Sequence, residues 1–149
     1  MDPARTKDIA AAASKLLASS YTLYLKTHNF HWNVKGPMFT TLHTLFETQY
    51  TELALAVDEI AERIRALGHV APGTYAQFAS LSEVSEADGV PSAIEMIEIL
   101  TADQEIVASC ARGLIRAASE ADDNASEDLA IRRIDVHEKA AWMLRSHLE

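Results

Sequence analysis

The stretch 38–68, MFTTLHTLFETQYTELALAVDEIAERIRALG, gives the clearest indication of the fold. Its apolar residues recur every three or four positions, which is the spacing of one face of an α-helix. Gly68 follows the last of them, as glycine often does at the C-terminal end of a helix. The segment therefore predicts a long amphipathic helix from about Met38 to Leu67, whose inner face carries Leu42, Phe46, Gln49, Leu53, Val57, Ile60, Ile64 and Leu67.

A second long helix is predicted upstream, from about Pro3 to Val34. Gly36 and Pro37 end it and leave only a short connection to the next helix. Two helices joined so closely form an antiparallel hairpin. The inner face of the upstream helix is predicted to carry Ile9, Ala13, Leu16, Ser20, Leu23 and Thr27.

The segment after Gly68 predicts a long crossover with one short helix, because Tyr75, Phe78 and Leu81 stand within an otherwise polar stretch. Pro91 suits the first turn of a third long helix. A fourth runs from the acidic segment 120–128 to about Leu148. The inner faces of these two are predicted to carry Ile94, Ile97, Leu100, Val107, Ala111, Leu114 and Ala118, and then Leu129 or Ile131, Ile134, Ala141, Leu144 and Leu148.

Two hairpins joined by a long link predict an all-α, ferritin-like four-helix bundle with a short helix in the crossover between helices 2 and 3. We expect residues 1–149 to form a single domain with a short N-terminal tail of about residues 1–6. Inert bundles and cytokine-like bundles share this pattern, so the architecture alone does not give the function.

The composition narrows the functional classes. The net charge of −9 repels phosphate backbones, so nucleic acid is not the default partner. The single cysteine, Cys110, cannot form an intrachain disulfide, and no signal stretch opens the chain, so we expect a cytoplasmic protein. No apolar run reaches the roughly 18 residues of a membrane span, so we expect no membrane partner.

A polar stripe borders the inner face of the second helix. It consists of His43, Glu47, Tyr50, Ala54, Asp58, Ala61 and Glu62, which fall within a narrow arc at about 100° per residue. His43 with Glu47, and Asp58 with Glu62, are spaced to chelate a metal from neighbouring turns. The alternative is an ordinary solvated face whose acids are neutralised by Arg63 or Arg65. The small alanines in the stripe favour close approach by another helix.

His31 lies just before the turn of the hairpin and therefore near His43. Asp58, however, lies roughly 22 Å along the helix from His43, and Glu62 lies further still. One subunit therefore cannot assemble all four ligands around one ion. A two-fold axis that lays two copies of the second helix antiparallel solves this, since His31 and His43 of one chain then face the acids of its mate.

Mixed imidazole and carboxylate ligands suit iron or zinc, and a site with few protein ligands leaves positions open for an oxidant. Trp32, next to His31, is either an auxiliary electron donor or a packing residue at the subunit contact. His28, His69, His137 and His147 are interpreted as structural residues.

Six motifs spread over nearly the whole chain are HNFHWNV (28–34), Gly36-Pro37, His43, DEIAERIRALG (58–68), YAQF (75–78) and HEKAAWMLR (137–145). Together they give the chain a close resemblance to the Dps family of mini-ferritins. This resemblance implies a hollow dodecamer whose ferroxidase centres lie at two-fold interfaces, with His31 and His43 from one chain and Asp58 and Glu62 from another. It further implies oxidation of Fe(II), preferably with hydrogen peroxide and otherwise with dioxygen, and storage of ferric mineral that protects the cell from oxidative damage.

Two parts of the resemblance leave roles open. Glu47 stands where many members place Asp, so it is either a metal ligand or a hydrogen-bond partner of one. The acidic segment Asp122, Asp123, Glu127 and Asp128 matches the region that lines iron-entry pores, although one or two of these acids can instead cap the last helix.

Two alternatives come from other classes. A structural or nucleoid-associated assembly would have no ferroxidase activity. The start of the chain has only Arg5 and Lys7 beside Asp2 and Asp8, so we expect DNA binding to be weak or absent. An ordinary di-iron ferritin or oxygenase usually carries Glu-x-x-His pairs inside the bundle, and this sequence contains none.

Overall fold

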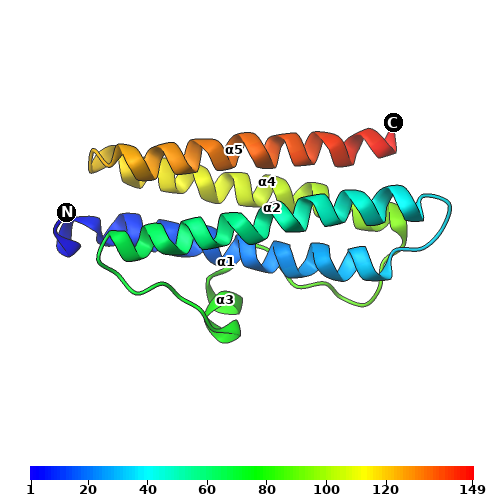
Figure 1. Cartoon of the computed structure of the whole chain (residues 1–149), viewed down its shortest axis with the longest axis horizontal. Coiled ribbons are helices and arrows are strands. Elements are labelled where there is room, and N and C mark those ends of the chain that lie inside the picture. The colour runs from blue at the N-terminus through cyan, green and yellow to red at the C-terminus, as the bar shows by residue number, and fades with distance from the viewer.

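The computed structural model describes all residues from 1 to 149 and contains helices but no strands. Four long helices lie side by side (Figure 1): α1 (Pro3–Asn33), α2 (Phe39–Ala66), α4 (Ala93–Glu120) and α5 (Asn124–Arg145). The short α3 (Tyr75–Leu81) interrupts the crossover, and a 3-10 helix (Ser146–Leu148) follows α5. The predicted all-α bundle with a short helix in the crossover is therefore confirmed.

The helices share one hydrophobic core. α1 packs against α2, α4 and α3, and α4 packs against α5, whereas α2 touches α5 only lightly. Burying each large apolar side chain contributes about 1.5–3 kcal/mol. The largest fully buried side chains are Phe30, Phe46, Ile9, Leu16, Leu23, Leu42, Leu53, Ile60, Ile64, Met96, Ile97 and Leu100. Ten of these were predicted from the helical spacing, and the structure adds Phe30 and Met96.

Helix α4 begins with a capping box. The Ser92 hydroxyl accepts a hydrogen bond from the Glu95 backbone N–H at 3.2 Å, and the Glu95 side chain accepts one from the Ser92 N–H at 3.1 Å. These two bonds satisfy donors that the first turn of a helix otherwise leaves unpaired. The sequence predicted Pro91 in the first turn of this helix. In the structure Pro91 lies just before the N-cap Ser92 and therefore outside α4.

The start of α1 packs against the end of α2. The Thr6 hydroxyl is buried and donates to the Leu67 carbonyl oxygen at 2.9 Å. Gly68 has a φ of +92°, and a Cβ there would lie 2.9 Å from the Pro3 Cγ atom, so glycine suits both the conformation and the close approach. Because α1 already begins at Pro3, most of the expected N-terminal tail is helical.

Three apolar residues expected in the core are exposed. Ile94 lies in the first turn of α4, and Leu148 lies in the 3-10 helix beyond α5. Ile131 is exposed because the buried face of α5 runs through Leu129, Ala130, Arg133, His137, Ala141 and Leu144. Polar residues thus occupy the centre of the inner face of α5.

None of the helices combines the length and the hydrophobicity that crossing a membrane requires.

Candidate metal centre

The turn between α1 and α2 brings His31 and His43 together. His31 lies in the last turn of α1, and His43 lies early in α2. Gly36 adopts a φ of +106°, and its carbonyl oxygen accepts a hydrogen bond from the Phe39 N–H at 3.0 Å. This tight turn places α2 beside α1, as the sequence predicted for a helical hairpin.

The two imidazoles are held by reciprocal hydrogen bonds. Nδ1 of His31 lies 2.6 Å from the backbone oxygen of His43, and Nδ1 of His43 lies 2.7 Å from the backbone oxygen of His31. The rings stack with centroids 3.7 Å apart and an angle of 13° between their planes. Each helix therefore orients the ligand that the other helix carries.

This geometry fixes the tautomer of both rings. A carbonyl oxygen can only accept a hydrogen bond, so each Nδ1 must carry the proton. In the neutral ring Nε2 then keeps its lone pair, which is the form that binds a metal. His31 and His43 consequently present two nearly parallel Nε2 donors, with His31 buried and His43 half-buried.

Glu47 is close to one of these nitrogens. Its Oε1 atom lies 3.9 Å from Nε2 of His31, and its side chain is exposed. A carboxylate at this distance from an Nε2 lone pair can share a cation with it or accept a hydrogen bond from water bound there. Both roles considered for Glu47 remain compatible with its position.

Asp58 and Glu62 form a separate acidic pair further along α2. Both side chains are exposed. A hydrogen bond with Asp58, followed by the negative charge of Asp58, raises the pKa of Glu62. Two carboxylates that repel each other in this way favour a bound proton or cation.

One chain does not bring all four predicted ligands together. No group of three or more His, Cys, Asp or Glu side chains is close enough to hold a metal ion. The straight helix α2 keeps Asp58 roughly 22 Å from His43. The chain therefore presents two half-sites, one of imidazoles and one of carboxylates.

Aromatic rings surround the imidazole half-site. The His28 ring lies 4.0 Å from Trp32 and 4.3 Å from Tyr50, between ring centroids. Tyr50 also meets His31 edge-on at 5.2 Å, and Phe39 stacks on His43 at 5.0 Å. Burial, followed by the charge of His31, lowers the pKa of His28. His28, Trp32 and Tyr50 were each named from the sequence, but neither their contacts with one another nor the part played by Phe39 was predicted.

Asp123 differs from the other acids considered for a pore. It is buried, caps α5 by accepting from the Ser126 N–H at 3.3 Å, and pairs with Arg63 at 2.9 Å. Burial alone would raise its pKa, but the bonds from Ser126 and Arg63 outweigh it and lower the pKa. Asp123 is therefore a capping residue of α5, which is the alternative that the sequence left open for one or two of these acids.

The remaining pore candidates lie nearer to solvent. Asp128 is exposed and pairs with Arg132 at 3.1 Å, so its charge is partly neutralised. Asp122 is exposed and Glu127 is half-buried. These two carry no ion pair within the chain, which leaves them as the better candidates for attracting cations.

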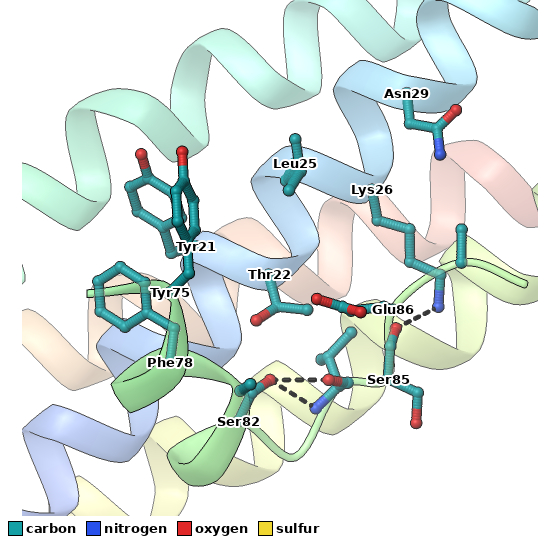
Figure 2. Close-up of a pocket in the computed structure, with 13 residues that line it drawn as sticks. Tyr21, Thr22, Leu25, Lys26, Asn29, Tyr75, Phe78, Ser82, Ser85 and Glu86 are labelled. Carbon is teal, nitrogen blue, oxygen red and sulfur yellow. Dashed lines mark hydrogen bonds between the residues drawn. The ribbon is translucent and has the colours of Figure 1, made fainter. Parts of the chain in front are cut away.

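A cavity of about 610 Å³ lies elsewhere, between α1 and the crossover (Figure 2). Its wall includes Tyr21, Leu25 and Phe78, and the buried Lys26 donates to the Ser85 carbonyl oxygen at 2.9 Å. None of the predicted site residues lines it. The candidate metal centre is thus a surface feature of the α1–α2 hairpin.

Comparison with known proteins identifies the family of this fold. Residues 10–149 match the family model of the ferritin-like domain. A "DNA protection during starvation protein 2" from Bacillus anthracis is 39% identical over 142 residues, which cover 95% of this chain and 97% of that protein. The crystal structure of a Dps protein from Bacillus brevis covers 100% of both chains with a TM-score of 0.95 and 36% identity. This chain belongs to the Dps family of ferritin-like proteins.

The Dps likeness extends to more distant members. A Dps protein from Vibrio cholerae O1, described as a member of a broad superfamily of ferritin-like diiron-carboxylate proteins, has a TM-score of 0.95 at 29% identity and covers 100% of this chain and 94% of its own. The Dps fold recognised from the sequence is therefore confirmed, and membership of this superfamily supports a role in iron storage.

Proposed function

We propose that this protein binds Fe(II) at centres shared between two subunits, oxidises it, and stores the ferric product. His31 and His43 of one subunit and Asp58 and Glu62 of another bind the substrate iron. The observation that carries the proposal is the reciprocal bonding of His31 and His43, which leaves two Nε2 lone pairs directed away from the backbone. Neutral imidazole with carboxylate is a donor set that suits Fe(II).

The exposed surface supports a two-fold contact at these half-sites. Trp32 is 59% exposed beside His31, and Leu55 is 72% exposed one turn before Asp58 and about two turns before Glu62. Large apolar side chains next to polar groups are typical of surfaces that another protein covers. An antiparallel crossing of two α2 helices near Tyr50 buries both residues and completes two equivalent centres.

The chemistry needs two electrons for each peroxide. Two Fe(II), one hydrogen peroxide and two protons give two Fe(III) and two water molecules, so no hydroxyl radical is released. We propose hydrogen peroxide as the preferred oxidant and dioxygen as the slower one. When a single Fe(II) is bound, Trp32 can supply the second electron, because its ring lies 4.0 Å from His28, whose ring lies 6.2 Å from His31.

The proposed assembly rests on the resemblance to Dps proteins. We propose a hollow dodecamer built from these dimers, with mineral stored inside and with Asp122 and Glu127 attracting iron at its entry points. Asp128 contributes less, because Arg132 neutralises part of its charge.

Mixing two inactive variants tests the shared site. His31→Ala and Asp58→Ala chains are each expected to lose fast oxidation of Fe(II) while keeping their helicity. When the two are unfolded together and refolded, random pairing restores one intact centre in each mixed dimer, so roughly a quarter of the centres recover. The measurement is the rate of Fe(III) formation with peroxide by stopped-flow absorption.

The matched control mixes His31→Ala with His43→Ala. Both substitutions damage the same half-site, so no mixed dimer contains an intact centre and no activity returns. Equal recovery in both mixtures would overturn the shared site. Wild-type protein that consumes peroxide with Fe(II) no faster than buffer does would instead favour a structural assembly without ferroxidase activity.

A further inference from the structure

A polar network joins α5 to α2 and α4, at residues other than those of the two half-sites. It extends from two buried side chains of α5 to Glu52, whose side chain is 40% exposed. Arg133 and His137 lie one turn apart on the inner face of α5 and are 4% and 1% exposed. Both terminal nitrogens of Arg133 bond to the two carboxylate oxygens of Glu52 on α2. Gln104 on α4 completes the network, since its Oε1 atom lies 2.7 Å from Nδ1 of His137.

The directions of these bonds fix the state of His137. A guanidinium can only donate, and Nη2 of Arg133 lies 3.1 Å from Nε2 of His137, so this nitrogen carries a lone pair. Nδ1 of His137 therefore carries the proton and donates a hydrogen bond to the Gln104 amide oxygen. The ring is a neutral imidazole with its lone pair directed at a cation and its other nitrogen held by an amide.

The groups around Arg133 have the chemistry of metal ligands. An imidazole Nε2 and a carboxylate face one positive centre, and an amide oxygen orients the imidazole from behind, as in many metal sites. Gln49 lies one turn before Glu52 on α2, is buried, and has an Oε1 atom without a hydrogen-bond partner. Ferritin-like di-iron proteins hold their metals inside the bundle with carboxylate and imidazole ligands.

We propose that the Arg133 guanidinium occupies a cation site between α2 and α5 and thereby excludes metal ions from the ligands Glu52 and His137. The guanidinium takes the place of the metal. A divalent ion can bind there only if Arg133 leaves, and separating a buried guanidinium from its carboxylate partner is costly. Arg133 thus keeps Glu52 and His137 from competing for iron with the two half-sites.

The test uses Zn(II) as the probe and the full-length, assembled protein. Crystals of the wild type and of Arg133→Ala are soaked in Zn(II), and anomalous X-ray scattering locates the ion. The wild type is expected to show no peak at bonding distance from Nε2 of His137. Arg133→Ala is expected to show one peak there, and calorimetric titration is expected to count one additional Zn(II) per chain.

Two controls separate the site from general loosening of the bundle. Arg133→Lys retains a cation and is expected to gain no Zn(II). Arg133→Ala combined with His137→Ala is expected to lose the additional Zn(II) that Arg133→Ala gains. An interior peak in the wild type, or a folded Arg133→Ala protein without one, would overturn the proposal.

Arg133→Gln provides a second route if the alanine variant does not fold. Its neutral side chain fills more of the space, and it is expected to gain the same additional Zn(II) per chain. A folded glutamine variant with the wild-type Zn(II) count would contradict exclusion by charge.

Discussion

Nδ1 of His31 bonds to the backbone oxygen of His43, and Nδ1 of His43 bonds to the backbone oxygen of His31. Two helices thereby hold each other's imidazole ring. Both rings are fixed in the metal-free chain, so little rotamer freedom would be lost on binding the iron that we propose as substrate.

The first prediction concerns these tautomers. Nitrogen-15 NMR of metal-free protein should show Nδ1–H and an unprotonated Nε2 for both His31 and His43 near neutral pH, because a carbonyl oxygen accepts from each Nδ1. The urea-unfolded chain is the reference for unconstrained rings. Observation of the Nε2–H form at either residue in the folded protein would contradict the bonding described here.

Leu55→Lys should weaken the assembly. The side chain is 72% exposed in the single chain, and its burial against a partner would contribute about 1.5–3 kcal/mol. Sedimentation velocity should show a larger fraction of small species at low protein concentration. Ile94→Lys is the matched control, since Ile94 is also exposed but lies on α4, which carries no half-site. Equal dissociation of both variants would count against α2 as the contact.

Stability should fall as the pH drops from about 6.5 to about 3. Burial, followed by the charge of Arg133, lowers the pKa of His137 to about 3, whereas the unfolded chain titrates near 6.5. The unfolded state therefore binds more protons between these values, and acidification favours it by an amount on the order of a few kcal/mol. Urea unfolding between pH 7 and 4.5 measures the slope.

His137→Gln removes the titrating group and should flatten this pH dependence. The amide can still bond to a neighbouring polar group, so the variant is expected to fold. Identical slopes for the wild type and the variant would show that other groups cause the acid destabilisation.

Asp123→Ala should lower the free energy of unfolding by roughly 1–2 kcal/mol, because it removes the cap of α5. It also leaves the Arg63 guanidinium without its carboxylate partner. Since the pKa of Asp123 is lowered in the folded state, the stabilisation is present above about pH 4 and is lost below it. The exposed Asp122→Ala variant is the control and should stay near the wild-type value in chemical denaturation.

DNA binding should be weak at physiological salt. Arg5 and Lys7 are exposed on α1, but the net charge of the chain is −9. Few phosphates can be neutralised, so we expect a dissociation constant of roughly 10⁻⁴ M or weaker. A gel-shift titration at moderate salt measures this, and tight retention of duplex DNA there would refute the expectation.

Local patterns in the sequence predicted the four long helices and the separation of the half-sites, but they did not predict the capping box of α4. Apolar spacing in α1 and α2 is a local property of the chain, and it placed Leu42, Phe46 and Ile60 correctly. The distance between His43 and Asp58 also followed from the sequence, because a straight helix rises by a fixed amount for each residue.

Which side chains contact one another depends on how the helices pack, and this was known only from the tertiary structure. Ile131 and Arg133 lie two positions apart on α5, and packing against α2 and α4 exposed the first and buried the second. Helical spacing could not give this result, since it does not say whether Glu52 and Gln104 will supply partners for a buried charge. The tautomers of His31 and His43 likewise depend on carbonyl groups from the opposite helix, which no local pattern specifies.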